Sequence, residues 1–393
     1  MIGEAQAKAQ GRVERMPRRI SGVDTARGLA LIGMFVAHVA EPAASVDLTE
    51  LIALADERPR LLFALTAGIG LGLLTGGTRP AVGEKWVLRR QIAIRALLLI
   101  ALGVFVVAVF NPLVFVILDV YGVAFLLMRP LIFIPWRTAI AVGAVLLTVT
   151  PAIASMAERD PAWLLVRDSG GGFVVDWFLT GAYPVIIWVP VMLIGLGLAR
   201  ADVAAPAVVR GYALGGVVAA SVCLPVSRLL PGAASLGVDD AAAAWGLPLR
   251  ASLEAMGNVG VGLVIVAACV TLTALARPRV RRVAGAVLSP VTAMGAMPLT
   301  IYTAHLVVIA SSKRVVDGFV TDDSWALLVG LVIGSMVFAW LWQRFVGRGP
   351  LEAAFRWASG RGRSGSGGAG GGGPASAPAP PGPPSAVARP APA

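Results

Sequence analysis

Charged residues are scarce in this chain. Only 14% of its 393 residues are Asp, Glu, Lys or Arg, whereas 57% are hydrophobic and the mean hydropathy is +0.80. Soluble domains carry about 25% charged residues, so this composition excludes an ordinary soluble protein. It predicts an all-α, polytopic integral membrane protein. The net charge of +11 does not indicate a nucleic-acid partner, because the basic residues cluster between apolar runs.

Cysteine and histidine are nearly absent, and their absence excludes several classes of site. The two cysteines, Cys223 and Cys269, both lie in apolar runs, which argues against a disulfide framework. The two histidines, His38 and His305, belong to no cluster with metal-ligand spacing, so we expect no metal. The sequence also lacks a nucleotide-binding P-loop, a Rossmann fingerprint and a G-x-S-x-G turn in a convincing context.

Long apolar runs are abundant, and they predict about ten transmembrane helices in one domain over residues 26–358. The expected spans are 26–44, 59–76, 91–110, 113–134, 137–156, 181–199, 211–228, 257–276, 289–311 and 324–345. A basic N-terminal tail, 1–25, precedes this domain. A tail rich in Gly, Pro and Ala, 359–393, follows it and is too poor in large apolar residues to pack into a core.

The distribution of basic residues orients these spans. With both termini in the cytoplasm, 24 Lys and Arg residues fall on the cytoplasmic side and eight on the outer side, and Arg95 lies inside a span. An excess of Lys and Arg marks cytoplasmic loops, so we expect cytoplasmic N and C termini. Arg95 is near the start of its span, where its side chain is expected to extend to the membrane interface.

Two segments carry local signals. In the second span, Gly68, Gly72 and Gly76 recur every four residues, which predicts a helix face that another helix approaches closely. The connection 157–180 is long for a compact protein, and connections of this length are often functional.

The first span contains charged residues that a bilayer disfavours. Arg27 and His38 are eleven residues apart, about three helical turns, so their side chains lie on nearly one face, roughly 16 Å apart. Asp24 falls on the same side. A charge at the bilayer centre costs about 2.5–3.5 kcal/mol on insertion scales, which makes such residues functional candidates. Alternatively, Asp24 and Arg27 are an anchor pair at the interface, and His38 is a hydrogen-bonding residue between helices.

More polar residues are predicted at membrane depth: Glu41, Asp119, Tyr121, Tyr302 and His305. The first and ninth spans both run outward, so His38 and His305 are expected at similar depths, and Asp119 enters from the outer side. We expect these three to line one cavity, in which a neutral imidazole acts as general base and a carboxylate orients it. Asp119 and Tyr121 are alternatively ordinary helix contacts or interface residues.

A series of short motifs resembles known families. Residues 19–34, RISGVDTARGLALIGM, resemble the opening of the YeiB-like bacterial membrane proteins (domain of unknown function 418) and the first span of heparan-α-glucosaminide N-acetyltransferase. Further resemblances to the YeiB-like proteins follow in chain order at residues 60–70, 89–90, 119–122, 183–197, 299–302 and 349–356. The similarity covers about residues 18–358, and the part from about 181 to 358 resembles domain of unknown function 418. YeiB-like proteins usually have Asn at the place of His38 and Gln at the place of His305.

This resemblance implies a transmembrane acyltransferase that takes an acyl group, commonly acetyl, from acetyl-CoA in the cytoplasm. The Arg27 and His38 pair is also similar to the Arg and His pair of membrane O-acyltransferases that decorate bacterial polysaccharides. We expect three groups of site residues: catalytic His38, His305 and Asp119; donor-binding Arg27 and Asp24; and substrate-binding Glu41, Tyr121 and Tyr302.

Two functions are favoured by these features, ahead of a structural or sensor protein without chemistry. The first is transfer of an acyl (acetyl) group from cytoplasmic acyl-CoA to an extracytoplasmic glycan or lipid-linked acceptor, in the cell (plasma) membrane. The alternative is a multi-span transporter or flippase-associated protein without acyl transfer, which prolines inside spans and polar groups near the midplane favour. The expected partners are the lipid bilayer and a cell-envelope glycan or lipid acceptor. We allow for a homodimer and expect no nucleic acid.

Overall fold

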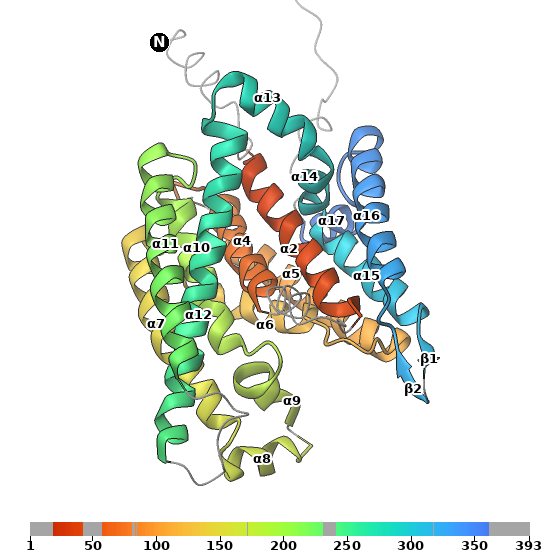
Figure 1. Cartoon of the computed structure of the whole chain (residues 1–393). Helices are drawn as coiled ribbons and strands as arrows, with labels where there is room; N and C mark the ends of the chain where they lie inside the picture. Colours follow the sequence, from red (N-terminus) through yellow and green to blue (C-terminus); the bar gives the residue numbers. More distant parts are fainter. Residues whose placement is uncertain are drawn as a thin grey trace, which may run out of the picture.

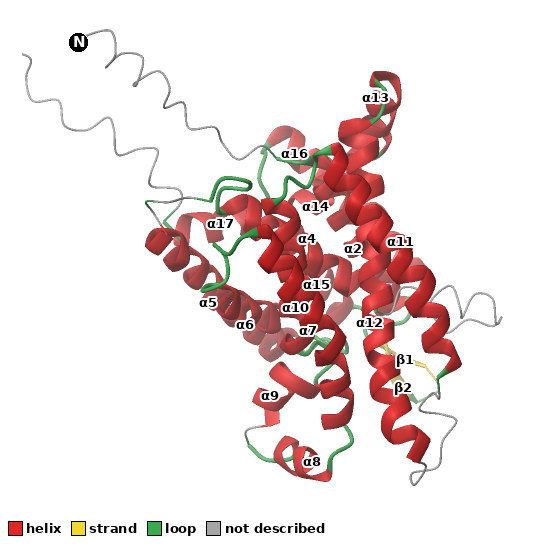
Figure 2. Ribbon diagram, turned by 90° about the vertical axis from the view of Figure 1, so that its left-hand side faces the viewer, coloured by secondary structure: helices red, strands yellow, loops and turns green. Residues whose placement is uncertain are grey.

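A computed structural model of the chain describes residues 19–41, 57–80, 83, 85–170, 172–230, 241–316 and 318–360. These residues are almost entirely helical, with one two-stranded hairpin, as the sequence predicts (Figures 1 and 2). Most of the two predicted tails, residues 1–18 and 361–393, lies outside the described residues.

The elements of the first half are α2 (Ser21–Val39), α4 (Arg58–Leu74), α5 (Lys85–Phe110), α6 (Leu118–Met128), α7 (Trp136–Ala157), α8 (Pro161–Arg167), α9 (Gly172–Val175), the π-helical turn η1 (Asp176–Thr180) and α10 (Val185–Arg200). The second half contains α11 (Pro206–Leu229), α12 (Ala241–Val270), the π-helical turn η3 (Thr271–Leu275), α13 (Pro278–Val287), α14 (Ser289–Ala296), α15 (Pro298–Ser311), α16 (Trp325–Phe345) and α17 (Pro350–Ala358). Strands β1 (Arg314–Val316) and β2 (Phe319–Thr321) pair antiparallel.

Six of the described helices are long and apolar enough to cross a membrane, and two bent helix pairs raise that number to eight. Ten full-length spans are not found in the described part of the chain. The predicted span 113–134 contains only α6, whose 11 residues extend about 16 Å, well short of a hydrocarbon core of about 30 Å. Asn111 and Pro112 end the preceding helix, and turns at 129–134 end α6.

Helix α2 begins at Ser21, five residues before the predicted start of the first span, and ends at Val39. The predicted basic tail 1–25 therefore extends too far, because its last residues are helical. This shift has a consequence for the site. Asp24 lies in the first turn of α2 and His38 in the last turn. The predicted span 26–44 placed His38 further from the end of its helix than the structure does.

The glycines of α4 pack as the sequence predicts. A Cβ atom at Gly68 would lie 2.1 Å from the carbonyl oxygen of Met192, and one at Gly72 would lie 2.5 Å from the Cβ of Ala199, both on α10. Gly76 lies outside the helix: it follows the end of α4 and has φ 110°, a conformation that favours glycine. Helices α4 and α10 are therefore in close backbone contact.

A buried arginine ties the end of α4 to its neighbours. Arg200, the last residue of α10, is 5% exposed and donates hydrogen bonds to Thr75 and to the carbonyl oxygens of Gly77 and Ile132. Cations are favourable near carbonyl groups at a helix C-terminus. Arg200 therefore joins α10, the end of α4 and the segment after α6.

The predicted ninth span, 289–311, is broken. Helices α14 and α15 meet at an angle of 89°. Pro298 begins α15, and a proline disfavours helical geometry in the residue before it, here Met297 with φ −132° and ψ 55°. The two parts of this segment therefore point in different directions from one junction.

The connections separate to two ends of the molecule. The predicted outer connection 157–180 folds into α8, α9 and η1, which lie with the β1–β2 hairpin at the end opposite α13 (Figure 1). Helix α13 contains the basic residues of the predicted cytoplasmic connection 277–288. The structure thus places the predicted inner and outer connections at opposite ends, while the orientation in a bilayer stays a prediction.

Candidate functional site

The two histidines of the chain are in direct contact. His38 on α2 and His305 on α15 place Nδ1 of His38 3.2 Å from Nε2 of His305, and their rings are nearly parallel at an angle of 11°. His305 is 1% exposed and packs between the rings of Phe35 and Tyr302. His38 is partly exposed. The structure therefore joins two residues that are 267 positions apart in sequence.

The hydrogen bonds of this pair determine which nitrogens carry protons when both rings are neutral. Nδ1 of His305 faces the backbone carbonyl oxygen of Tyr302, which can only accept, so this nitrogen donates. Nε2 of His305 then has a lone pair and accepts from Nδ1 of His38. Within the described residues nothing bonds to His38 Nε2, so its lone pair is available, and a neutral imidazole in this state can take a proton from a hydroxyl or amine.

A cavity of about 180 Å³ lies on the other side of Tyr302. Arg27, Arg95, Tyr121 and Tyr302 supply its polar groups, and α4, α5 and α6 supply apolar walls. The Tyr121 hydroxyl donates to the carbonyl oxygen of Phe63, and the Tyr302 hydroxyl accepts from the backbone N–H of Ile117. Arg27, Tyr121 and Tyr302 thus line one cavity, and Tyr302 also contacts the ring of His305.

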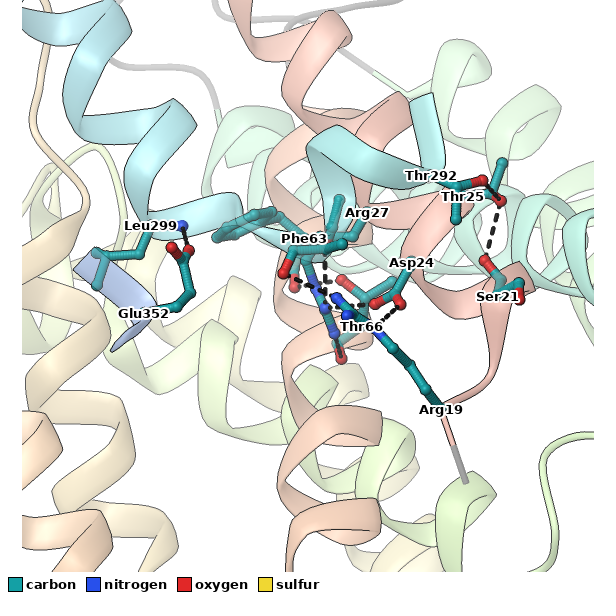
Figure 3. Close-up of polar contacts among 12 residues, drawn as sticks. Arg19, Ser21, Asp24, Thr25, Arg27, Phe63, Thr66, Thr292, Leu299 and Glu352 are labelled. Carbon is teal, nitrogen blue, oxygen red and sulfur yellow. Dashed lines mark hydrogen bonds and ion pairs between the residues drawn. The ribbon is translucent and has the colours of Figure 1, made fainter. Parts of the chain in front are cut away.

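Arg27 is held by three helices. Its guanidinium donates to Asp24 in α2, to the carbonyl oxygen of Thr66 in α4 and to that of Gly295 in α14 (Figure 3). Asp24 also accepts from Arg19 at 2.6 Å. Three of the five N–H groups of Arg27 are used in this way. Asp24 therefore positions Arg27 directly, and two N–H groups of Arg27 stay available to a ligand in the cavity.

Charged side chains satisfy both sides of the break between α14 and α15. At the end of α14, the carbonyl oxygens of Gly295 and Ala296 accept from Arg27 and Arg19. At the start of α15, Glu352 of α17 accepts from the backbone N–H groups of Leu299 and Thr300 and from the Thr300 hydroxyl. These charges match the partial charges of the helix ends. The backbone groups that the break between α14 and α15 frees therefore have hydrogen-bond partners on both sides.

A larger groove, of about 1030 Å³, adjoins the cavity and shares Leu74 with it. Arg19 and Arg281 line this groove, together with the turn at Gly76 and Gly77. It lies at the end of the molecule that the sequence assigns to the cytoplasm. Its size and basic residues suit a larger anionic molecule.

Two predicted site residues lie apart from the imidazoles. Asp119 accepts from the indole N–H of Trp177 at 2.9 Å and from the backbone N–H of Val120, and in the described structure it contacts neither histidine. The group that orients an imidazole is instead the Tyr302 carbonyl oxygen. Glu41, after the end of α2, pairs with Arg314 of the β hairpin at 3.4 Å.

The sequence interpretation missed two residues of this region. Arg95 lines the cavity beside Arg27, whereas the sequence suggested that it extends to the membrane interface. Its position one turn inside the predicted span could have indicated burial. Glu352 had no sequence signal of its own, because the α15 terminus that it caps is more than 50 residues away.

Sequence comparison bears on what this site does. A family model described as heparan-α-glucosaminide N-acetyltransferase, catalytic, matches residues 19–220, just over half of the chain. The chain belongs to this family. A second model, protein of unknown function (DUF418), matches residues 207–361, a later start than the predicted 181. A search of curated proteins finds no match.

Membership of the N-acetyltransferase family indicates a membrane acyltransferase-like protein. Arg27 and His38 lie in the segment matched by the N-acetyltransferase model, and Tyr302 and His305 lie in the segment matched by the second model. The contact between the imidazoles therefore joins the two matched segments into one site. Among the described residues, no group of three or more His, Cys, Asp or Glu side chains could hold a metal ion.

Proposed function

We propose that this protein transfers an acyl group, acetyl in the simplest case, from cytoplasmic acyl-CoA to an acceptor outside the cytoplasm. The acceptor is a cell-envelope glycan or a lipid-linked molecule with a hydroxyl or amine nucleophile, and the membrane is the plasma membrane. The observation that carries this proposal is the contact between His38 and His305 in a chain of the N-acetyltransferase family. That contact leaves one imidazole nitrogen ready to act as a base.

The acyl-CoA donor fits the groove and the adjoining cavity, which are both lined by residues of the α2 region. The groove with Arg19 and Arg281 suits the nucleotide part of CoA, and the adjoining cavity contains Arg27. From Arg27 to His38 is about 16 Å along the helix axis, a suitable reach for an extended pantetheine arm. The thioester would then lie near Tyr302 and the imidazole pair.

The transfer step follows from the proton positions. His38 Nε2 takes the proton of the acceptor hydroxyl or amine as the acceptor atom attacks the thioester carbonyl carbon. His305 supports the resulting charge on His38 by accepting its Nδ1 hydrogen bond. The carbon–sulfur bond breaks, the new ester or amide forms, and the CoA thiolate takes the proton from His38 Nε2. The products are free CoA and the acylated acceptor, and both rings return to their initial state.

Inverted vesicles that contain the purified protein provide the test. Acetyl-CoA is labelled with ¹⁴C in the acetyl group and with ³H in the CoA, and cell-envelope lipid and glycan extracts are enclosed as acceptors. We expect ¹⁴C to appear in the enclosed acceptor while ³H stays outside as free CoA. His38→Ala protein should transfer no label. Vesicles with wild-type protein in which ¹⁴C never reaches any acceptor fraction would contradict the proposal.

The break of 89° between α14 and α15 also favours the alternative of a transporter, because discontinuous helices are typical of substrate sites in transporters. The same experiment separates the two functions. Transport of acetyl-CoA would move the intact molecule, so the two labels would cross together and keep their ratio, whereas acyl transfer separates them.

A further inference from the structure

Arg95 is a second arginine in the cavity, deep within its helix. It lies ten residues after Lys85, the first residue of α5, which is about 15 Å along the helix axis. The side chain lines the same cavity as Arg27, Tyr121 and Tyr302. Its location is therefore not that of an arginine that extends to water from a helix end.

The surroundings of Arg95 contain no bound counter-charge. Among the described residues it takes part in no hydrogen bond or ion pair, whereas Arg89 on the same helix donates to two backbone carbonyl oxygens. Glu352 is the carboxylate that acts most on Arg95, but its oxygens already accept bonds from the start of α15. Arg27 is a second cation near Arg95. A half-buried guanidinium without a partner, close to a second cation, is disfavoured, so Arg95 together with Arg27 favours a bound anion.

The available donors suit a phosphate group. Arg95 offers all of its N–H groups, and Arg27 offers the two that its structural bonds leave free. A guanidinium binds phosphate oxygens with two parallel hydrogen bonds. Tyr302 accepts from Ile117, and its own hydroxyl proton has no acceptor in the described part of the chain, so it is a third donor.

The rest of the cavity restricts what can be attached to that phosphate. Apart from Tyr121, whose hydroxyl already donates to the carbonyl oxygen of Phe63, the other lining residues are apolar, and they include Phe63, Leu71, Leu99, Leu118 and Phe125. A volume of about 180 Å³ holds a phosphate and a short part of a chain, but not a whole nucleotide. The ligand is therefore a phosphate ester whose neighbouring atoms are less polar than the phosphate.

We propose that Arg95 and Arg27, with the Tyr302 hydroxyl, form a phosphate-binding site inside the membrane domain. Two sources have this chemistry: the diphosphate of the acyl-CoA donor, next to its pantetheine arm, and the headgroup of an anionic phospholipid. The first source rests on the proposed function, and the second does not.

The first measurement separates a binding arginine from a structural one. Purified protein is washed free of lipid in a neutral detergent, and thermal unfolding is compared for wild type, Arg95→Met and Arg95→Lys. Removing a charge that only a ligand compensates should raise the unfolding temperature of the ligand-free protein, or leave it unchanged. A structural role for Arg95 predicts a lower temperature for Arg95→Met, and that result would overturn the proposal.

The second measurement identifies the source. CoA is titrated into each protein by calorimetry, and bound phosphatidylglycerol is counted by native mass spectrometry. Arg90→Met is the matched control, because Arg90 is on the same helix but exposed. We expect Arg95→Met to weaken one of these two ligands at least tenfold, Arg95→Lys to weaken it less, and Arg90→Met to have no effect.

The outcomes also separate this site from the proposed function. Loss of CoA binding assigns the donor diphosphate, and loss of phosphatidylglycerol alone assigns a lipid headgroup and leaves the donor to be bound elsewhere. CoA and lipid binding that are both unchanged in Arg95→Met would overturn the phosphate site. That last result leaves the acyl-transfer proposal standing, since the doubly labelled vesicles test it independently.

Discussion

At the scale of residues, the partners of the two imidazoles determine which ring nitrogens carry protons. His38 and His305 would be unremarkable hydrogen-bonding residues if each met a different partner. The Tyr302 carbonyl oxygen can only accept, so His305 Nδ1 carries a proton and His305 Nε2 accepts from His38 Nδ1. The lone pair that remains is on His38 Nε2. The partly exposed ring is the one that offers the base, and the buried ring supports it.

His38→Ala and His305→Ala should each abolish acyl transfer without preventing membrane insertion. The double variant should be little worse than either single one, because members of one catalytic unit are not additive. Transfer is measured in vesicles, and thermal unfolding is measured on the same preparations. Ser311→Ala, at the exposed end of α15, is the control. If the pair is only a contact between helices, stability falls by about 0.6–2 kcal/mol per lost bond while transfer persists.

Asp322, between β2 and α16, offers a test of pH dependence outside the spans. Burial raises its pKa, the residue is 5% exposed, and its Oδ2 has no hydrogen-bond partner among the described residues. A raised pKa in the folded state means that stability falls as pH rises above about 4 and the carboxyl group ionises. Asp322→Asn should therefore raise the unfolding temperature more at pH 7.5 than at pH 4.5.

Asp323→Asn serves as the neighbouring control for Asp322. The comparison uses detergent-solubilised protein at both pH values, with light scattering to detect aggregation. An equal gain for Asp322→Asn at the two pH values would show that the gain does not come from the ionised carboxylate.

At the scale of elements, the junction of α14 and α15 is the point where the structure concentrates charge. Three side chains meet its freed backbone groups: Arg19 and Arg27 on one side, and Glu352 on the other. The Thr300 hydroxyl, which donates to Glu352, also accepts from the backbone N–H of Leu351 in α17. The short C-terminal helix therefore fixes the start of α15, which contains Tyr302 and His305.

Glu352→Ala should destabilise the protein by about 0.5–2 kcal/mol, the usual range for losing a helix cap. Glu352→Gln should have a smaller effect, since one amide oxygen still accepts. Unfolding in detergent gives the stability, and transfer in vesicles shows whether the shifted α15 still presents His305. An unchanged unfolding midpoint for Glu352→Ala would mean that the cap contributes nothing.

Gly68→Ala tests the contact between α4 and α10. The new Cβ would meet a backbone carbonyl oxygen at 2.1 Å, and overpacking of this kind costs about 1–3 kcal/mol. Gly330→Ala on α16 is the matched control, because nothing lies within 4 Å of its added Cβ. The control should be neutral or more stable by up to about 1 kcal/mol, as expected for alanine in a helix. Similar unfolding midpoints for Gly68→Ala and Gly330→Ala would show that the close contact between α4 and α10 does not limit stability.

At the scale of the whole molecule, the short connecting elements gather at two opposite ends of the helical domain. One end presents α8, α9 and the hairpin, and the other presents α13 with its arginines (Figures 1 and 2). Along α2, the residues that line the groove and then the cavity come first, Ser21 and Arg27, and the imidazole pair lies further along, at His38. A donor from one side and an acceptor from the other would meet at that pair.

Single cysteines test this orientation in a background without Cys223 and Cys269. Positions Val166 and Trp245 should react from outside with a membrane-impermeant maleimide, whereas Trp86 and Val283 should not. All four side chains are exposed, so accessibility depends on the side of the membrane. Permeabilised cells supply the control, in which all four positions should react. Labelling of Trp86 and Val283 in intact cells would reverse or reject the topology.

The sequence alone determined the features that depend on composition and local spacing. A low charge content and long apolar runs decide that the chain is helical and membrane-embedded, because no other backbone structure except a closed barrel satisfies its hydrogen bonds in lipid. The spacing of Gly68 and Gly72 decides which face of α4 another helix approaches. The Arg27 and His38 spacing places both residues on one helix, whatever surrounds it.

Tertiary structure decided everything that depends on contacts distant in sequence. The meeting of His38 with His305, the cap that Glu352 places on α15, and the inward position of Arg95 each join segments tens to hundreds of residues apart. The described helices offer six to eight spans where the sequence predicts ten, since two segments are bent and α4 and α6 are short. Hydropathy measures how apolar a segment is but not whether its helix continues. Local patterns fix which residues prefer lipid or protein, and only packing fixes which of them meet.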